Sequence, residues 1–200
     1  MKVIGLTGGI ASGKSTIGRR LEALGAVRID ADQLARDAVA PGSPGLARVV
    51  SRFGSERVLN ARGELDRAAL GAIVFADPDA LRDLNEIVHP EVKRLYEAAL
   101  AAARAADSEA IVVYEIPLLV EAARELEFDL VVVADAPAES RVARMVELRG
   151  MGEADARRRI ANQASDADRR AAADVLIDTS GSEAHTVAQV DALWERLSGS

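Results

Sequence analysis

A glycine-rich phosphate-binding pattern, entered directly from a strand-like segment, is the feature that most restricts how this chain folds. The pattern G-x-x-x-x-G-K-[ST] is matched by Gly8, Gly13, Lys14 and Ser15. An apolar run at residues 3–7 precedes it and a helical pattern follows it. Glycines let the backbone curl until its N–H groups face phosphate oxygens, and the start of the helix adds positive dipole character. This context predicts a P-loop.

The residues of this loop are expected to hold a nucleoside triphosphate. Nucleotide binding is predicted for the run Gly8, Gly9, Ile10, Ala11, Ser12, Gly13, Lys14, Ser15 and Thr16. Lys14 is expected to reach the β- and γ-phosphates and to act in catalysis, and the Ser15 hydroxyl is expected to bind Mg²⁺. The predicted cofactors are therefore ATP and Mg²⁺.

Four further short apolar runs have the character of strands. They cover residues 26–29, 110–114, 129–134 and 174–178. Each is continuous rather than alternating with polar residues, as expected of strands buried on both faces of a parallel sheet. Helical patterns separate the runs, and strands that alternate with helices predict an α/β fold. We predict a P-loop NTPase three-layer fold with a parallel sheet, a helical substrate-binding insertion and a helical lid.

Two helical segments are predicted to interrupt the core of a single domain. The core covers about residues 1–30, 107–137 and 165–200. The acceptor-binding insertion covers about 31–106, with helical stretches near 31–40, 44–53, 66–75, 78–86 and 90–106. The lid covers about 138–164 as two helices, 138–149 and 153–164, and a last helix is predicted at 186–198. Helices at the carboxyl edge of a parallel sheet are well placed to cover a ligand.

Composition excludes several classes of function. The chain holds 25 Lys and Arg against 32 Asp and Glu, a net charge of −7, whereas a general nucleic-acid binder carries a basic excess. It has no cysteine, which excludes disulfides, thiolate metal sites and cysteine nucleophiles. No signal-peptide pattern is present, and no apolar run approaches the roughly 18 residues of a membrane span. We expect a cytoplasmic protein that binds neither nucleic acid nor membrane, as a monomer or small homo-oligomer.

Two carboxylates follow the second predicted strand. Asp30 and Asp32 flank Ala31, and because the carboxyl ends of parallel strands share one rim, the pair is expected near the phosphates. A carboxylate there accepts a proton from an attacking hydroxyl or holds a water on Mg²⁺. On the assumption that the strand continues and that only one of the two side chains faces the site, we select Asp32 as the catalytic base. The other interpretation is that one of them caps a helix that begins at residue 33.

Glu115 and His89 are further candidates with two interpretations each. Glu115 ends the third predicted strand, where P-loop proteins often place a metal-associated acid, but a surface or helix-capping role is the alternative. His89 precedes Pro90 at a predicted helix junction. A His-Pro pair is a natural helix start, so a structural role competes with an acceptor-site role.

The predicted lid is basic in an acidic chain. Residues 141–170 hold eight arginines and five acids. Arg141 and Arg144 are three apart and share a helix face, and guanidinium groups suit phosphate oxygens. We predict phosphate contacts from Arg144, as a catalytic residue, and from Arg149, while Arg157 and Arg158 face solvent. The alternative is a solvated helix surface with ion pairs.

These motifs together resemble the dephospho-coenzyme A kinase family, relatives of the nucleoside monophosphate kinases. The matching stretches are residues 4–16, 30–32, 64–67, 87–90, 117–121, 159–163 and 173–174. The resemblance implies transfer of the ATP γ-phosphate to the ribose 3′-hydroxyl of dephospho-coenzyme A, the last step of coenzyme A synthesis. It places Asp32 at the general-base position and His89, Pro117 and Leu118 at the acceptor site.

Two positions depart from the pattern of that family. Glu115 stands where such families usually carry Asp, and Thr179 replaces an expected Asn after the last strand, which would loosen base selectivity if that Asn holds adenine. The absence of an N-K-x-D motif argues against a GTPase. Two other functions stay open: a kinase for another small hydroxyl compound such as shikimate or gluconate, and a non-catalytic nucleotide-dependent switch.

Overall fold

The computed structural model describes residues 1–117, 119–122 and 126–199, so the predicted acceptor residue Leu118 lies outside the described residues. The chain divides into two compact units. The first consists of Met1–Asp30 and Ala103–Ser200, and the second of Ala31–Ala102.

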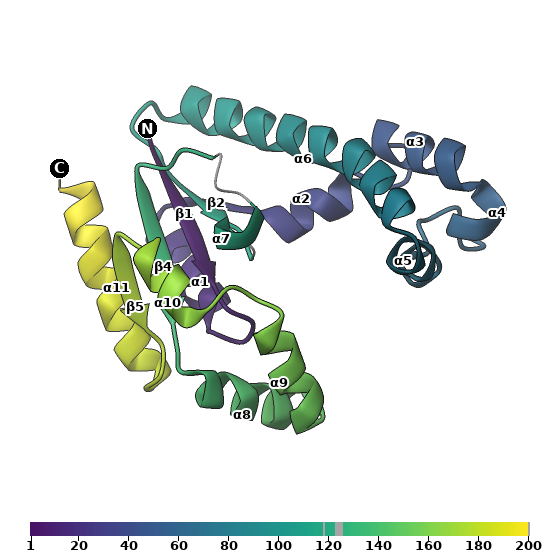
Figure 1. The fold of residues 1–200 in the computed structure, drawn as a ribbon. Helices are drawn as coiled ribbons and strands as arrows, with labels where there is room; N and C mark the ends of the chain where they lie inside the picture. Colours follow the sequence, from purple (N-terminus) through teal and green to yellow (C-terminus); the bar gives the residue numbers. More distant parts are fainter. Residues whose placement is uncertain (118, 123–125, 200) are drawn as a thin grey trace. The chain divides into compact units, whose positions relative to one another are not determined.

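The first unit is built on a five-stranded sheet in which every paired strand is parallel (Figure 1). The strands are β1 (Lys2–Gly8), β2 (Val27–Asp30), β3 (Ile111–Glu115), β4 (Leu130–Asp135) and β5 (Val175–Asp178), in the order β2-β3-β1-β4-β5. All five predicted strands are confirmed to within a few residues. Their parallel direction brings the ends of the strands to one rim, where Leu6 is in register with Glu115 and Gly8 with Ala134.

Helices cover both faces of the sheet. On one face, α1 (Lys14–Leu24) and α11 (Glu183–Ser198) bury an aliphatic core. Its residues include Ile4, Leu6, Ile17, Leu21, Val190 and Leu193. The other face receives α7 (Leu119–Ala122) and α10 (Asp166–Ala171), which lie in front of the strands in Figure 1. There the bare backbone of Gly5 leaves room for Leu119 and Phe128, both 3.0 Å from where a β-carbon would stand. The predicted α/β architecture is confirmed.

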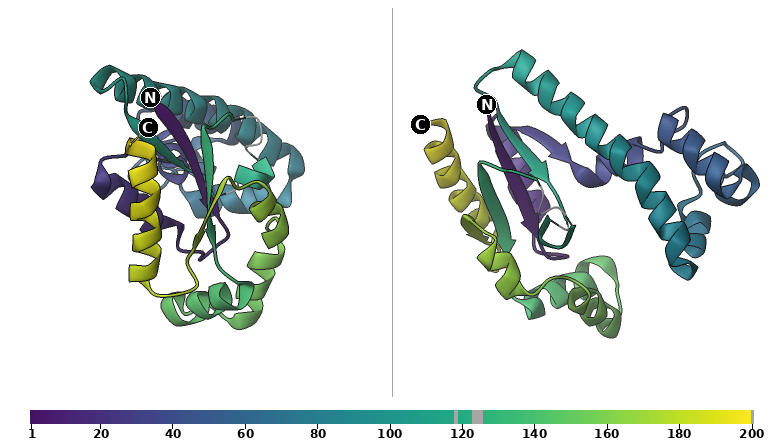
Figure 2. Two further views of the ribbon diagram at one scale, coloured as in Figure 1. Left: turned by 90° about the vertical axis from the view of Figure 1, so that its left-hand side faces the viewer. Right: turned by 45° about the horizontal axis from the view of Figure 1, so that its top comes forward.

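The predicted lid is a pair of helices at the carboxyl end of the sheet. They are α8 (Ala138–Arg149) and α9 (Glu153–Ala161), and Figure 2 (left) shows them at the end of the strands opposite the two termini. Gly150 ends α8 with a left-handed φ of 62°, a conformation that glycine adopts at little cost. Met145 and Ala156 form a small core onto which Ile10 packs, so the lid helices contact the P-loop. The second helix ends three residues before its predicted bound, and α10 was not predicted.

The second unit is helical. Its elements are α2 (Ala31–Asp37), α3 (Pro44–Phe53), α4 (Ser55–Val58), α5 (Arg67–Ala76) and the part of α6 (Pro78–Ala106) up to Ala102. Ser43 caps α3 by accepting the Leu46 N–H, and Asp66 caps α5 in the same way. Val49, Phe53 and Leu70 belong to a separate apolar core. No described helix is both long and apolar enough to cross a bilayer.

The prediction of two helices meeting at His89-Pro90 was wrong. A single helix, α6, contains Pro90 in its interior. Proline removes one hydrogen bond of the helical ladder, but the buried stripe runs on past it. Leu84, Ile87 and Val88 pack on the core of the second unit, and Glu91, at the next helical position of that stripe, is buried. Packing on both sides of Pro90 therefore keeps the helix continuous.

Candidate active site

The predicted P-loop lies between β1 and α1. Ser12 N donates to Gly9 O at 3.0 Å, and the loop is held in left-handed conformations at Ala11 (φ 60°) and Gly13 (φ 86°). A non-glycine residue with such a φ costs about 1 kcal/mol or more, and strain of this kind collects at functional sites. The Ile10 N–H donates to Gln163 Oε1 at 2.8 Å. The loop is therefore fixed both by its own turns and by the chain that follows the lid.

Glu115 joins the two side chains of the phosphate-binding pattern. Its Oε1 lies 3.3 Å from Lys14 Nζ and 3.4 Å from Ser15 Oγ, both of which donate to it. Glu115 is only 3% exposed, so the surface interpretation of this residue was wrong. The arrangement places an ammonium, a hydroxyl and a carboxylate together at the rim of the sheet.

Arg28, on β2, holds the other oxygen of Glu115. Its Nε and Nη2 donate to Oε2 at 2.9 and 2.6 Å. Burial lowers the pKa of Arg28, but the hydrogen bonds and charge of Glu115 outweigh it and the pKa is raised. Asp30 Oδ2 lies 3.7 Å from the same guanidinium. Glu115 is thus fixed in place by a cation on each side.

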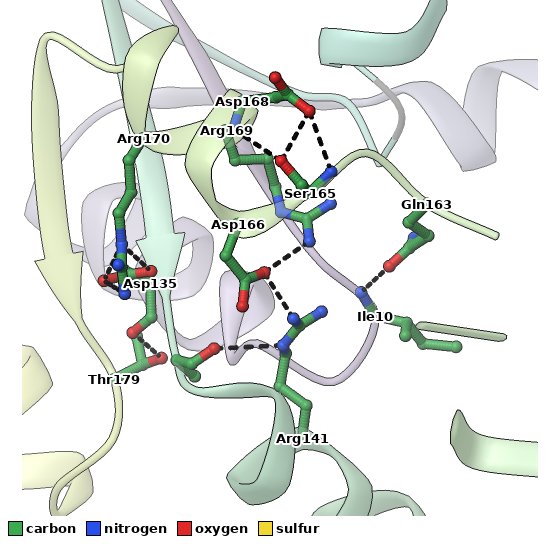
Figure 3. Close-up of polar contacts among 11 residues, drawn as sticks. Ile10, Asp135, Arg141, Gln163, Ser165, Asp166, Asp168, Arg169, Arg170 and Thr179 are labelled. Atoms are coloured by element: carbon green, nitrogen blue, oxygen red, sulfur yellow. Dashed lines mark hydrogen bonds and ion pairs between the residues drawn. The ribbon is translucent and has the colours of Figure 1, made fainter. Parts of the chain in front are cut away.

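Arg141, rather than Arg144, is the lid arginine buried against the P-loop (Figure 3). It is 1% exposed, and a β-carbon on Gly9 would come within 2.2 Å of its Nη1. Its Nε donates to Ala136 O at 3.1 Å and its Nη2 to Asp166 Oδ1 at 2.6 Å. Nη1 is buried and has no hydrogen-bond partner among the described residues. Burial lowers the pKa of this guanidinium, yet an arginine stays charged at neutral pH.

Arg144 also reaches the loop, but its donors meet carbonyl groups. Its Nη1 donates to Ala11 O at 3.2 Å and its Nη2 to Thr179 O. Thr179 is buried and its hydroxyl donates to Ser12 O at 2.5 Å. The threonine that stands in place of the expected Asn therefore binds the backbone of the P-loop. Arg149 is exposed in the last turn of α8.

Arg157 and Arg158 face solvent, as predicted. Arg157 is exposed and pairs with Glu139 and Glu153, while Arg158 is exposed beside Asp155. These ion pairs occupy the outer surface of the two helices. They fit the alternative of a solvated helix surface, which therefore holds for this part of the lid.

Two predicted site residues belong to the second unit. Asp32 lies exposed in the first turn of α2. Residues two apart in a strand point to the same face, so alternation cannot distinguish Asp32 from Asp30, and β2 in any case ends at Asp30. The argument that selected Asp32 over Asp30 was therefore wrong. His89 is exposed and lines a shallow depression along α6 with Arg82 and Asn85. Pro117, in the first unit, is half-buried after β3.

The loop has the donors and oxygen ligands that a magnesium–nucleotide complex requires. Ser12 Oγ is buried and has no hydrogen-bond partner among the described residues. The described residues include no cluster of three His, Cys, Asp or Glu that could hold a metal alone. Mg²⁺ binds few protein groups and takes its other ligands from phosphates and water. Ser15 and Glu115 supply hard oxygen atoms of this kind.

Sequence reasoning missed the burial of Arg141 against Gly9 of the P-loop and the contact of Gln163 with Ile10. Each residue lay close to a signal in the sequence. Arg141 shares a helix face with Arg144, and Gln163 ends one of the stretches that resemble a known family. Asp166 carried no motif, and its link to Arg141 joins residues 25 positions apart.

Comparison with known proteins identifies the family. A family model described as dephospho-CoA kinase matches residues 2–185. The chain belongs to the dephospho-CoA kinase family. A protein named dephospho-CoA kinase from Leifsonia xyli subsp. xyli is 57% identical over 199 residues, covering 100% of both chains. The chain is accordingly an ATP-dependent dephospho-CoA kinase, acting in the last step of coenzyme A biosynthesis.

Solved structures share this fold. TT1252 from Thermus thermophilus is 33% identical with a TM-score of 0.81, covering 98% of this chain and 97% of that one. A shikimate kinase from Acinetobacter baumannii, 18% identical with a TM-score of 0.50 and coverage of 100% and 94%, shares the fold alone. The question left open between dephospho-CoA, a shikimate-like acceptor and a non-catalytic switch is therefore answered in favour of dephospho-CoA.

Proposed function

We propose that this kinase transfers the ATP γ-phosphate in line to the ribose 3′-hydroxyl of dephospho-CoA, with Asp32 as base and with Lys14 and arginines of the lid binding phosphate. The observation that carries the proposal is the arrangement around the P-loop. Lys14 and Ser15 meet on Glu115 at one end of the loop. Nη1 of Arg141, which no described residue binds, lies against Gly9. Phosphoryl transfer needs positioning and charge compensation, which this arrangement supplies.

The donor half of the reaction rests on the loop from Gly8 to Thr16. Its backbone N–H groups and the start of α1 bind the triphosphate, and Lys14 Nζ moves from Glu115 onto the β- and γ-phosphates. Ser15 holds Mg²⁺, which, when bound, neutralises phosphate charge. Glu115 would then be left beside Ser15 as a second hard oxygen ligand.

The lid completes the charge compensation. Arg141 offers Nη1 to the phosphates, which adds to the predicted roles of Arg144 and Arg149. Arg144 already binds the Ala11 carbonyl, so it supports the loop from the lid side. Closure of α8 and α9 over the nucleotide excludes water, and exclusion of water suppresses ATP hydrolysis.

The acceptor half rests on the second unit. Asp32, exposed at the start of α2, orients the 3′-hydroxyl and takes its proton as its oxygen bonds to the γ-phosphorus. The bond from the γ-phosphorus to the β,γ-bridging oxygen breaks in the same step, and ADP leaves. His89, on the depression along α6, contacts the acceptor, as do Pro117 and Leu118 from the first unit. The polar groups of Arg82 and Asn85 beside His89 suit the phosphates and amides of a dephospho-CoA molecule.

A steady-state assay tests the reaction and its acceptor together. ADP release is measured with Mg²⁺-ATP and, in turn, dephospho-CoA, shikimate and gluconate, and the phosphorylated carbon of the product is located by NMR. We expect release that depends on dephospho-CoA, a 3′-phosphate product, and loss of activity with EDTA that added Mg²⁺ restores. Equal release with each acceptor, or release without any, would contradict the proposal.

We also propose that the protein works in the cytoplasm as a monomer or small homo-oligomer. The cysteine-free sequence suits a reducing compartment without requiring it. Light scattering coupled to size-exclusion chromatography measures the mass, and cell fractionation with antibody detection measures the location. A large assembly or a membrane-pellet fraction would contradict this part of the proposal.

A further inference from the structure

One carboxylate oxygen beside the P-loop joins two buried arginines from different helices. Asp166 Oδ1 accepts a hydrogen bond from Arg141 Nη2 at 2.6 Å and one from Arg169 Nη2 at 2.8 Å. Figure 3 shows both guanidinium groups turned toward it. The side chains of Arg141 and Arg169 are only 2% and 6% exposed. Two cations with so little hydration require an anion between them.

Both guanidinium groups lie against the same point of the loop. A β-carbon on Gly9 would come within 2.2 Å of Arg141 Nη1 and 3.3 Å of Arg169 Nη2. Of the three nitrogens of Arg141, Nε is bound to Ala136 O and Nη2 to Asp166, while Nη1 has no hydrogen-bond partner among the described residues. The guanidinium is therefore fixed by two contacts with its third nitrogen facing the loop.

The charges of this cluster favour the same arrangement. Burial lowers the pKa of Arg141, Arg169 lowers it further, and Asp166 opposes both. Burial raises the pKa of Asp166, but the hydrogen bond from Arg169 and the charge of Arg141 outweigh it and leave the pKa below its ordinary value. Asp166 is thus ionised at neutral pH, and the cluster of one acid and two arginines keeps a net positive charge beside Gly9.

Local structure fixes where the Asp166 carboxylate points. Asp166 is the first residue of α10, and the preceding Ser165 forms a capping box with Asp168. Ser165 Oγ accepts the Asp168 N–H at 3.0 Å, and Asp168 Oδ2 accepts the Ser165 N–H at 3.3 Å. Gln163, two residues earlier, accepts the Ile10 N–H of the loop. The chain on both sides of Asp166 is therefore held in place. Gln163 is bound to the P-loop, and Ser165 and Asp168 are bound to each other.

We propose that Asp166 is a positioning residue for phosphoryl transfer, which holds Arg141 so that Nη1 is presented at Gly9 to the phosphates of ATP. The inference rests on the phosphate role of Arg141 proposed above. Asp166 itself contacts no substrate and acts through the arginine. A donor held in place before the reaction stabilises the developing charge without a cost for reorganisation.

Replacement of the carboxylate by its amide tests the idea with little change in shape. In Asp166→Asn the two arginines lose their anion, and we expect kcat to fall about tenfold or more, with weaker ADP binding by calorimetry. The KM for dephospho-CoA stays the same because Arg141 is assigned to the nucleotide. Asp166→Glu, which restores the charge, recovers at least part of kcat.

Two further variants separate the possible outcomes. Glu139→Gln removes an exposed acid on α8 that pairs with Arg157 on α9, and it leaves kcat unchanged. An Asp166→Asn enzyme with kcat within about twofold of wild type overturns the inference, as does an Asp166→Glu enzyme that is equally impaired. If Arg141→Lys is fully active, the phosphate role of Arg141 has failed. If Arg141→Lys is impaired and Asp166→Asn is not, only the positioning role has failed.

Discussion

Gly18 lies so close to Glu115 that a β-carbon on Gly18 would stand 2.9 Å from Glu115 Oε2. The same β-carbon would stand 2.9 Å from Arg28 Nε. Helix α1 therefore passes directly over the ion pair that joins β2 to β3 and that, through Glu115, reaches Lys14. Because Gly18 has no side chain, α1 can pass this close to the buried ion pair.

Gly18→Ala is predicted to destabilise the protein although alanine is the better helix former. The helical gain is about 1 kcal/mol, but a β-carbon this close to two charged atoms forces the Arg28–Glu115 pair apart. We expect a net loss of about 1 to 2 kcal/mol in unfolding free energy. Weaker ADP binding accompanies it, because Glu115 also contacts Lys14. Chemical denaturation and calorimetry measure the two effects.

Gly71→Ala is the matched control, since Gly71 lies inside α5 with open space. There a β-carbon would meet only the Phe75 ring, at 3.6 Å, which is an ordinary contact. This variant is expected to gain about 0.5 to 1 kcal/mol in stability. Equal gains at both glycines would show that the close approach at Gly18 imposes no constraint.

Glu115→Gln is predicted to destabilise the first unit through Arg28. Glu115 is 3% exposed, and removing one member of a buried ion pair leaves the other charge uncompensated. Because Asp30 remains 3.7 Å from Arg28, we expect a loss of about 2 to 3 kcal/mol rather than more. Urea denaturation at pH 7 measures it. Glu139→Gln, in an exposed pair, is the control, and an equal effect in both variants would contradict the assignment of a buried pair.

The main features of the core could be predicted from the sequence because they depend on local patterns. A buried parallel strand is a continuous apolar run, and a P-loop is a fixed spacing of glycines, so β1 to β5 and the placement of Lys14 and Ser15 could be predicted. Helix α10 was missed because its six residues, DADRRA, carry no apolar stripe. A helix boundary was wrongly predicted at Pro90, because the buried stripe of α6 continues past the proline.

The lid contacts depended on packing that spacing does not encode. Arg141 and Arg144 share a helix face, and sequence alone gives no reason for one of them to be buried against Gly9. Packing decides which arginine is buried, because Val142 and Met145 of α8 belong to a small core on which Ile10 of the P-loop packs. The partner of Arg141 is Asp166, on a helix that was not predicted.

The stability of the protein is predicted to depend on pH through Asp166. Its pKa in the folded state is below the ordinary value of 3.8, so its ionised form stabilises the fold at pH values above the ordinary value. That contribution is lost as the pH falls through the lower, folded-state pKa. We expect the difference in unfolding free energy between wild type and Asp166→Asn to be constant near neutrality and to shrink below about pH 4. A difference that grows toward acid pH would contradict the sign of the shift.

Asp32→Asn is predicted to separate binding from chemistry. The amide keeps the shape of the exposed side chain at the start of α2 but cannot take a proton, so the variant should fold and bind ATP like wild type. We expect kcat to fall by about 10² to 10⁴, the usual contribution of a general base. Thermal unfolding, ATP calorimetry and coupled ADP release measure the three properties.

Asp37→Asn is the control for the Asp32 variant, because Asp37 ends the same helix and accepts a hydrogen bond from Gln33 Nε2 at 2.8 Å. It should keep wild-type kcat. If Asp32→Asn also turns over like wild type, Asp32 is not the base. Asp30, the last residue of β2, then becomes the carboxylate to replace, since it is the other acid at this end of the strand. A loss of kcat in Asp32→Asn alone would support the choice of Asp32, which strand alternation does not justify.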